Sequence, residues 1–511
     1  MSDFKAASDL PGADRVQAEP LAGFTSLDGQ NRAANPGADP EGLNRAVTTA
    51  DQTALPAVIQ PDTAAGANGS RFVRACLRLP VDRTPVWFLR QAGRYMPEYM
   101  AVRRHHSLLD ICRTPEIAAE VTITAAERLG VDAAIIFADL LLPLTPMGLD
   151  FEFVANEGPQ IHAPIRTAAQ ARALRTDRTQ DLLYVARAIE KVAAHFAAKG
   201  ASSSSAVGAN ALKGTGFSPS VAPLPSKGAG SPGLQPRVSP DGISSAQDQL
   251  GIIGFCGAPF TLASYMIEGG SSRNYIETKK MMYASTSSLT QQSCHPERSA
   301  AESKDLRSPA TDSSQQSCHP ERSAAESKDL RSPATDSSPE SDAWPILMSK
   351  LVTVLTDYAA QQVEAGADVI QVFDSWVGAL SPSDYGEYAL APTTALIRNI
   401  QALGVPVIYF GVETSTLLPL MRHTGADVLG LDWRTPLDRT WRELDFSVAV
   451  QGNLDPITLF APEKVLEARV AEVLAAAAGR PGHIFNLGHG IVPTTPVDAV
   501  LQVVQQVKRS A

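Results

Sequence analysis

The chain of 511 residues lacks the features of a membrane-spanning or secreted protein. It contains no run of about 18 apolar residues, the length that a transmembrane helix needs. Its N-terminal stretch lacks the basic start and apolar core of a secretory signal. The five cysteines form no C-x-x-C pair. We therefore expect a cytoplasmic protein without structural disulfides and without a membrane partner.

Basic residues are also in the minority. The sequence has 44 Lys and Arg against 54 Asp and Glu, a formal net charge of −10 at pH 7. Because nucleic-acid-binding proteins usually carry a basic surface, this balance argues against a nucleic-acid partner. Any site for an anion must therefore be built locally. Aromatic residues make up only 6% of the chain, but hydrophobic residues make up 44%, which is enough for a large core.

Two segments show no sustained apolar period. Residues 1–69 are rich in Ala, Gly, Asp and Pro, and we predict that they form a disordered extension before the domain at 70–511. Residues 201–247 are rich in Ser, Gly and Pro, which is typical of a flexible insert.

A second insert, 287–341, contains a tandem repeat. The 24-residue sequence at 291–314 occurs again, unchanged, at 315–338. Each copy carries adjacent Cys and His residues, Cys294-His295 and Cys318-His319. A shared zinc site is one interpretation, but adjacent residues lack the usual spacing of zinc ligands. We favour a disordered loop that arose by duplication, because two identical polar copies cannot bury a core.

The rest of the chain reads as eight βα units. Short apolar runs, typical of strands buried on both faces of a parallel sheet, recur at 85–90, 133–138, 251–256, 368–373, 406–410, 427–432, 448–452 and 483–488. Helical patterns lie between them, for example at 115–130, 181–200 and 462–479. Eight such units predict an α/β fold with a single (β/α)8 TIM barrel. An open doubly wound sheet is the alternative, but no G-x-G-x-x-G turn follows an early strand.

Polar residues cluster where these strands end. They are Arg90, Arg94, Asp139, Asp374, Ser375, Asp432, Arg434, Asn453, Asp455 and His489. In a barrel of this kind, active sites lie at the carboxyl ends of the strands. The pattern therefore predicts that these side chains converge on one site.

Three arginines near the first strand indicate an anionic ligand. Arg90 and Arg94 flank a segment with Gly93, and Arg103 follows. The planar guanidinium group suits carboxylates, so the simplest ligand is a polyanion. The alternative is a surface ion pair with Glu98 or Asp110.

Three further residues could serve the site or the core. Asp139 precedes three leucines, so it is either a buried structural acceptor or faces a cationic or N–H-rich ligand. Tyr265 either packs in the core or presents its hydroxyl at a pocket wall. His489 lies between two glycines at a strand end, which makes it a candidate ligand contact or acid–base group rather than a structural histidine.

Six segments resemble one enzyme family, in order, across nearly all of residues 70–511. They are PVWFLRQAGRYMPEY, FADLLLPLTPMG, GFCGAPFTLASYMIEGGSS, QVFDSWVGALSP, QGNLDP and FNLGHGI. The family is that of the uroporphyrinogen decarboxylases. The resemblance implies a cytoplasmic homodimer of TIM barrels in haem and tetrapyrrole biosynthesis. It implies decarboxylation of the four acetate side chains of uroporphyrinogen III to give coproporphyrinogen III, with neither a metal nor an organic cofactor.

The resemblance also assigns residues. Arg90, Arg94 and Arg103 match the family's carboxylate-binding arginines, and Asp139 matches the aspartate that accepts hydrogen bonds from the pyrrole N–H groups. The matching pocket residues are Tyr265, Ser375 and His489. Asp139 would stabilise a positively charged ring, and Arg90 would act as an electrostatic clamp, with proton donation as a second role left open. The sequence departs from the family at Ala138, where Ser is common, and in the extension and both inserts.

Two other functions compete with this one. A related barrel family transfers methyl groups with zinc and corrinoid, but it would need Cys or His ligands at the strand ends, where only His489 is placed. An inactive binding homologue, damaged by the inserts, is the other alternative.

Overall fold

The computed structural model describes residues 69–154, 158–211, 248–292 and 342–510. Residues 1–68 and 293–341 lie outside these ranges. The disorder of the extension and the interpretations of the tandem repeat therefore stay predictions.

A parallel sheet forms the centre of the described chain. Its seven strands are hydrogen-bonded in the order β1-β4-β5-β6-β7-β8-β9. They are β1 (Ala133–Ile135), β4 (Gly251–Gly257), β5 (Val369–Asp374), β6 (Val407–Gly411), β7 (Val428–Gly430), β8 (Ala449–Gln451) and β9 (His483–Ile484). Nearly all of these residues are buried, which explains why the runs are apolar throughout rather than alternating.

The segment before β1 closes the sheet into a ring. Val86 forms a parallel bridge with Phe485, just beyond β9. The Phe485 N–H donates to the Pro85 carbonyl at 2.9 Å, and the Asp132 N–H donates to the Val86 carbonyl at 2.8 Å, beside β1. The predicted (β/α)8 barrel is therefore confirmed. Its first strand, predicted at 85–90, is reduced to a short bridge, because the backbone turns at Arg90, where φ is 58°.

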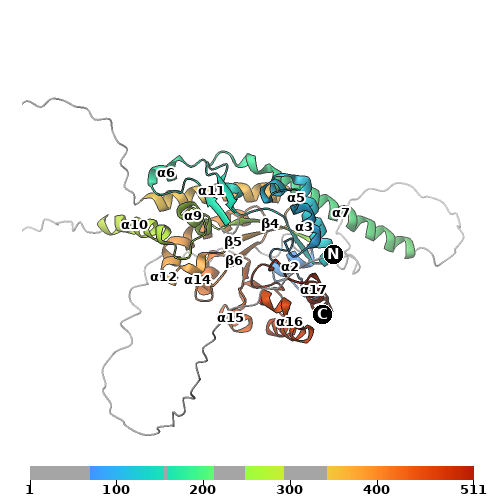
Figure 1. Ribbon diagram of the computed structural model, residues 1–511. Coiled ribbons are helices and arrows are strands. Elements are labelled where there is room, and N and C mark those ends of the chain that lie inside the picture. The colour runs from blue at the N-terminus through green and yellow to red at the C-terminus, as the bar shows by residue number, and fades with distance from the viewer. Residues whose placement is uncertain (1–68, 155–157, 212–247, 293–341, 511) are drawn as a thin grey trace, which may run out of the picture. The chain divides into compact units, whose positions relative to one another are not determined.

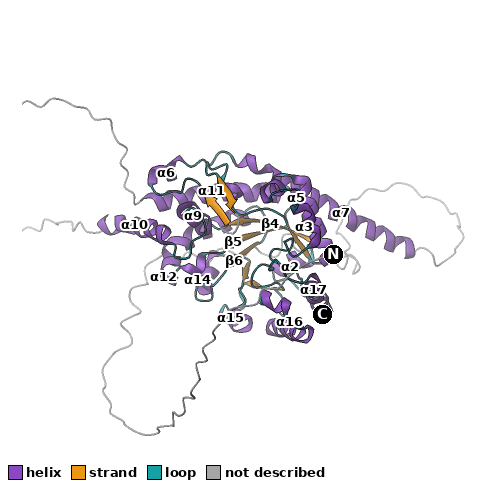
Figure 2. Cartoon of the chain, in the orientation of Figure 1, coloured by secondary structure: helices purple, strands orange, loops and turns teal. Residues whose placement is uncertain are grey.

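Helices surround this ring (Figure 1; Figure 2). The α-helices are α2 (Arg71–Cys76), α3 (Pro97–Arg103), α4 (Leu108–Arg113), α5 (Pro115–Leu129), α6 (Ala168–Ala173), α7 (Leu183–Ala211), α9 (Pro259–Glu268), α10 (Ile276–Gln292), α11 (Ala343–Glu364), α12 (Pro382–Asp384), α13 (Leu390–Gln401), α14 (Leu418–Met421), α15 (Leu437–Glu443), α16 (Glu463–Ala477) and α17 (Val497–Arg509). Shorter turns are η1 (Leu142–Leu144), η2 (Thr179–Leu182), η4 (Val377–Ala379), the π-helical η5 (Tyr385–Ala389), η6 (Arg422–Thr424) and η7 (Pro456–Phe460).

Helix α5 illustrates how the sequence sets these boundaries. Pro115 occupies the first turn, where its missing N–H costs no hydrogen bond, and Glu116 faces the helix dipole there. Gly130 ends the helix in the left-handed conformation, with φ of 65°. The buried residues between them recur at helical spacing, and they are Ala118, Ala119, Val121, Thr122, Ala125, Ala126 and Leu129.

The predicted helices at 115–130, 181–200 and 462–479 are confirmed as α5, η2 with α7, and α16. Two helices continue past the residues at which the inserts were predicted to begin. Helix α7 continues to Ala211, although the Ser-rich composition places the start of the insert at 201. Helix α10 continues to Gln292, past 287. Once a helix exists, each added residue forms one more hydrogen bond, and this outweighs the modest propensity of Ser.

One element outside the ring, a pair of antiparallel strands, was not predicted from the sequence. Strands β2 (Phe151–Val154) and β3 (Gly158–Ile161) form an antiparallel pair. Gln160 bridges to Gly270, and the Ile161 N–H donates to the Gly269 carbonyl at 2.7 Å, so the pair joins the end of α9.

An ion cluster anchors the amino end of the ring. Arg71 is only 4% exposed and contacts three carboxylates, at 2.5 Å for Asp82, 2.9 Å for Asp248 and 3.1 Å for Asp132. Asp132 also accepts hydrogen bonds from Arg83, at 2.6 and 2.7 Å, and from the Val86 N–H, at 2.9 Å. This cluster fixes the closing segment at the end opposite to Arg90.

In the described parts of the chain, no helix is long and apolar enough to cross a membrane.

Candidate active site

Two hydrogen bonds to the segment that follows β9 fix the backbone beside Arg90. The Leu89 N–H donates to Asn486 Oδ1 at 3.0 Å, and the Ile491 N–H donates to the Leu89 carbonyl at 3.0 Å. Arg90 then adopts a left-handed conformation, which is uncommon for a residue with a side chain. Such a conformation persists only where the surroundings hold it, and it is common at functional sites. The Arg90 side chain is exposed at the carboxyl end of the ring.

The Gly-His-Gly turn around His489 packs between two neighbours. A Cβ at Gly490 would lie 2.5 Å from Cδ of Arg90, and a Cβ at Gly488 would lie 2.1 Å from the backbone nitrogen of Trp433. Both glycines are therefore required by close approach. The half-buried His489 ring meets the Trp433 ring edge-on, with centroids 5.8 Å apart. Burial lowers the pKa of His489, and the Arg90 charge lowers it further.

Asp139 lies beyond β1, beside Arg90. Its Oδ1 accepts a hydrogen bond from the Leu141 N–H at 2.9 Å, and its side chain stays partly accessible. Burial raises the pKa of Asp139, while the Leu141 N–H and the Arg90 charge act in the opposite direction. The pKa of Tyr265 is raised by burial and then by the Asp139 charge. Asp139 is therefore a local structural acceptor that also stands close to Arg90 and Tyr265.

Tyr265 lies on α9 and stacks on Trp376. The ring centroids are 3.7 Å apart and the planes are inclined by 32°. The Tyr275 ring also contacts Trp376, edge-on, with centroids 5.4 Å apart. Ser375, which precedes Trp376 directly, is half-buried at the end of β5. The stack therefore joins the Tyr265 helix to the loop that carries Ser375.

A buried network holds that loop against α9. The Thr261 hydroxyl donates to Asp374 Oδ1 at 2.6 Å and accepts from the Trp376 N–H at 3.2 Å. The Tyr409 hydroxyl donates to Asp374 Oδ2 at 2.8 Å. Burial raises the pKa of Asp374 to about 6, despite the two hydroxyl donors. Asp374 is fully buried, so it positions its neighbours rather than lining the mouth of the barrel.

Arg103 is the last residue of α3, and Arg94 lies in the turn before that helix. The Arg103 guanidinium donates to the His106 carbonyl and to the Tyr99 hydroxyl. The pKa of Tyr99 is raised by burial, and the charges of Arg103 and Arg94 lower it, which places both cations near this hydroxyl. The Tyr99 ring packs on Phe137, with centroids 5.3 Å apart, two residues before Asp139. Tyr99 thus links Arg94 and Arg103 to the segment that follows β1.

The two carboxylates considered as surface partners for the arginines are engaged elsewhere. Glu98 lies 3.5 Å from Arg128. Asp110 forms a capping box with Ser107 at the start of α4.

Three polar residues after β7 and β8, Asp432, Asn453 and Asp455, serve mainly to hold loops. Asp432 is 1% exposed and accepts from the Glu413 N–H at 2.6 Å and from the Thr435 hydroxyl at 2.9 Å. The Asn453 amide donates to the carbonyls of Asp432 and Thr435 at 2.7 and 2.6 Å. Asp455 caps η7 through the Ile457 N–H. These strand-end residues therefore shape the site without projecting into it.

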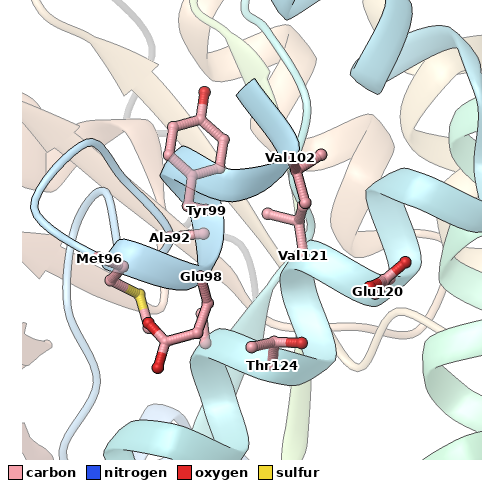
Figure 3. Close-up of a pocket in the computed structure, with 9 residues that line it drawn as sticks. Ala92, Met96, Glu98, Tyr99, Val102, Glu120, Val121 and Thr124 are labelled. Atoms are coloured by element: carbon pink, nitrogen blue, oxygen red, sulfur yellow. The ribbon is translucent and has the colours of Figure 1, made fainter. Parts of the chain in front are cut away.

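A cavity of about 220 Å³ lies behind the arginine loop, between α3 and α5 (Figure 3). Its lining residues are Ala92, Met96, Glu98, Tyr99, Val102, Glu120, Val121, Thr124 and Ala125. Ala92 lies in the loop after Arg90, and Met96 is the N-cap of α3. The other lining residues belong to α3 and α5, so the cavity is separate from the strand ends.

The sequence reasoning missed Thr261, Trp376 and Tyr99. Thr261 and Trp376 lie inside motifs that were singled out for Tyr265 and Ser375, and Tyr99 is the second tyrosine of the arginine segment. Their contacts join residues far apart in the chain, so no local pattern marks them.

Comparison with known proteins decides the family. The sequence model described as "Uroporphyrinogen decarboxylase (URO-D)" matches residues 68–209, 242–292 and 325–510. The chain belongs to the uroporphyrinogen decarboxylase family. The gaps in this match fall within the two inserts, so the barrel is the part shared with the uroporphyrinogen decarboxylase family.

Relatives from several bacteria support this membership. The uroporphyrinogen decarboxylase of Koribacter versatilis is 49% identical over 435 residues, which cover 85% of this chain and 94% of that protein. Those of Solibacter usitatus and Chloroflexus aurantiacus are 39% and 41% identical, and each alignment covers 86% of this chain, with 97% and 95% of the relatives.

A solved structure supports the fold. A methyltransferase from Methanosarcina mazei aligns with a TM-score of 0.55 and 16% identity, over 86% of this chain and 98% of that one. This likeness concerns the fold alone. Among the described residues, no group of three or more His, Cys, Asp or Glu side chains is arranged to hold a metal ion.

Proposed function

We propose that this protein decarboxylates the four acetate side chains of uroporphyrinogen III to give coproporphyrinogen III, in haem and tetrapyrrole biosynthesis. Family membership supports the reaction. The observation that carries the site assignment is Asp139, a partly accessible carboxylate beyond the end of β1, whose pKa the Arg90 charge lowers and whose own charge raises the pKa of Tyr265.

The charges of the proposed substrate match this arrangement. Uroporphyrinogen III carries eight carboxylates around four pyrrole N–H donors. An anion with that pattern needs cations at the rim of a site and one acceptor at its centre. Arg90, Arg94 and Arg103 are the proposed rim cations, and Asp139 is the proposed acceptor of the pyrrole hydrogen bonds.

The reaction needs an electron sink. Protonation of a pyrrole α-carbon makes the ring cationic, so that the bond between the acetate methylene and its carboxylate breaks and its electrons flow into the ring. Carbon dioxide leaves, the exocyclic methylene takes a proton to become a methyl group, and the pyrrole α-carbon releases the proton that it had gained, which restores the pyrrole. Each turnover therefore consumes one proton per carboxylate lost. The Asp139 carboxylate stabilises the cationic ring in a site where water is scarce.

No redox or metal step is needed in this scheme, because the protonated ring itself accepts the electrons. The resemblance implies the same absence of a cofactor, which stays a proposal. Arg90 is proposed as a clamp on the reacting carboxylate. The ordinary pKa of arginine is above about 12, which makes it a weak proton donor.

His489, Tyr265 and Ser375 are proposed to orient substrate carboxylates by hydrogen bonds. The lowered pKa of His489 favours a neutral ring, which still donates one N–H. The raised pKa of Tyr265 keeps its hydroxyl protonated and able to donate. Both groups can therefore bind a carboxylate at neutral pH.

We also propose a cytoplasmic homodimer, on the strength of the family resemblance. Sedimentation equilibrium on the 511-residue chain measures the oligomeric state. A monomer at micromolar concentration would contradict the homodimer.

The test of function is anaerobic incubation of the purified protein with uroporphyrinogen III, followed by chromatography of the products. We expect coproporphyrinogen III, formed through intermediates with seven, six and five carboxylates. The Asp139→Ala variant should lose most turnover, at least about a hundredfold, because charge stabilisation of this kind is worth several kcal/mol. Its circular dichroism and melting temperature should resemble those of the parent.

Asp438→Ala is the matched control, because Asp438 lies on the exposed surface of α15. It should keep full activity. If Asp139→Ala formed product at the parent rate, the central role of Asp139 would be wrong. If the parent bound the substrate without converting it, the chain would instead be an inactive binding homologue.

A further inference from the structure

Arg434 lies at the mouth of the barrel, beyond the end of β7 and next to the His489 turn. It is 50% exposed. Its charge is one of those that lower the pKa of His489, after burial and the Arg90 charge. Arg434 is thus near His489, which also adjoins Arg90. The three residues come from three different strand ends of the ring.

The Arg434 guanidinium rests on an aromatic surface. Its Cζ lies 4.0 Å from the centroid of the Trp433 ring. Trp433 is itself fixed, because its backbone packs on Gly488 and its ring edge meets His489. A cation stacked on an indole is held in one plane, with its N–H groups directed outward around the ring edge.

The carboxylates near Arg434 leave most of its donors unused. Asp432 Oδ2 is 3.9 Å from the guanidinium, and Asp432 already accepts from the Glu413 N–H and the Thr435 hydroxyl. Glu413 Oε1 lies 3.5 Å away, longer than a good hydrogen bond, and both side chains of that pair are exposed. An exposed pair of this kind contributes little stability, so a ligand carboxylate can replace Glu413 at small cost.

We propose that Arg434 is a further substrate-binding residue, which takes a carboxylate of the polyanionic substrate in exchange for Glu413. This inference rests on the proposed function. Three rim arginines leave much of the charge of an eight-carboxylate ligand unmatched, and Arg434 supplies a fourth cation near the Arg90 side. Glu413 then competes with the substrate. It covers Arg434 in the free protein, and without Arg434 it would repel the incoming carboxylates.

The Glu413 side chain is well placed for this role. Glu413 has a left-handed backbone, with φ of 61°, two residues beyond β6, and Gly378 packs against its Cβ position. Its charge contributes to the raised pKa of Tyr275, whose ring adjoins Trp376. Glu413 therefore lies between the Arg434 side and the Tyr265–Trp376 stack, on the rim of the same mouth.

The experiment compares Arg434→Gln, Glu413→Gln and the double variant with the parent. Steady-state rates are measured with uroporphyrinogen III, and dissociation constants with uroporphyrin III, a non-reduced octacarboxylate probe followed by fluorescence. We expect Arg434→Gln to raise KM and Kd roughly three- to tenfold with kcat changed less than twofold, as for loss of uniform binding. Glu413→Gln should lower both constants roughly two- to threefold, and the double variant should lie between the single ones.

Arg442→Gln is the matched control, because Arg442 is an exposed arginine on α15 that lies 3.8 Å from Asp438. It should leave KM and Kd within twofold of the parent. The proposal is overturned if Arg434→Gln behaves like this control, or if it lowers kcat with KM and Kd unchanged.

The same data separate this proposal from the proposed function. If the parent forms no coproporphyrinogen but its Kd for uroporphyrin III depends on Arg434, the reaction is wrong and the binding residue stands. If the parent neither binds nor converts these compounds, both proposals fail.

Discussion

Gly490 shows how closely single residues are fitted around Arg90. The arginine side chain crosses the place where a side chain at 490 would stand, with Cδ, Cγ and Nε within 2.5, 2.7 and 3.0 Å of a Cβ there. The glycine therefore lets Arg90 lie against the turn that follows β9. A larger residue must displace the guanidinium, because the backbone on both sides is hydrogen-bonded.

We predict that Gly490→Ala lowers kcat/KM about ten- to a hundredfold while the melting temperature changes little. A misplacement of about 1 Å at a reacting group has this effect on rate. Gly386→Ala is the control, because no atom lies within 4 Å of a Cβ at that position. Equal activities in the two variants would show that the position of Arg90 is not critical.

The strand-end pattern of the sequence predicted that polar side chains from several strands would lie at one end of the barrel. Arg90, Asp139 and His489 follow three different strands and lie near one another, because carboxyl ends of parallel strands meet at one end of a barrel, while their roles in the site stay predictions. Arg103 could not be placed in this way, since it belongs to α3, and Arg94, expected at the end of the first strand, lies in the turn before that helix. The stacking of Trp376 on Tyr265 was also unpredictable, because it depends on the crossing of α9 and the β5 loop.

At the scale of elements, the closing segment depends on Asp132. This residue joins Arg71, Arg83 and the Val86 N–H at the amino end of the ring. Removal of one partner from a buried ion cluster leaves the remaining charges uncompensated.

Asp132→Ala should therefore reduce the free energy of unfolding by about 3–5 kcal/mol. Activity per folded molecule should stay within about threefold of the parent at low temperature, because the cluster lies at the end opposite to Arg90. Denaturant titration and rate assays measure the two effects. The exposed Asp438→Ala variant should change stability by less than about 1 kcal/mol, and a similar small change for Asp132→Ala would contradict a structural role for the cluster.

Elements were more predictable than their ends. The apolar runs and helical periods of the sequence identified seven strands and the main helices, because burial on both faces gives strands a continuous apolar character. The hairpin β2–β3 was missed, since its residues are half-exposed and mixed in polarity. The first strand was overestimated because its residues are as apolar as the others, while the turn at Arg90 ends its pairing early.

The whole molecule has a net charge of −10, yet its proposed substrate is an anion with eight carboxylates. General electrostatic attraction therefore cannot recruit the substrate. Binding has to rely on arginines gathered at one mouth. The stability of the whole molecule also depends on buried acids, of which Asp374 is the clearest case.

We predict that the contribution of Asp374 to the free energy of unfolding falls as the pH rises from about 4 to about 6. Its pKa is about 6 in the fold, against an ordinary value of 3.8, so in this range the native state holds a proton that the unfolded chain releases. This stabilisation is fully present below the unfolded pKa and is lost as the pH rises through the folded pKa. The loss is roughly 3 kcal/mol.

The Asp374→Asn variant cannot titrate at this position. The difference in unfolding free energy between the variant and the parent should therefore shift by roughly 3 kcal/mol in favour of the variant between pH 4 and pH 7. Other acids cancel in this difference. Denaturant titrations at several pH values measure it, and parallel pH curves would show that Asp374 does not titrate in this window.

The barrel closes at the bridge between Val86 and Phe485, and this closure, called the seam below, is weaker than the other strand pairings. Elsewhere, strands as long as β5 and β6 pair over five residues, whereas the ring closes here through one bridge and the bonds beside it. Spontaneous opening should therefore start at this seam, and the amide hydrogens of Trp87 and Phe485 should exchange with solvent before those of β5. Arg90 follows the seam directly, so each opening moves a cation that the substrate must hold. A polycarboxylate bound to Arg90 should therefore hold the closure shut. Slower hydrogen exchange of the Trp87 and Phe485 amides would then report that the site is occupied.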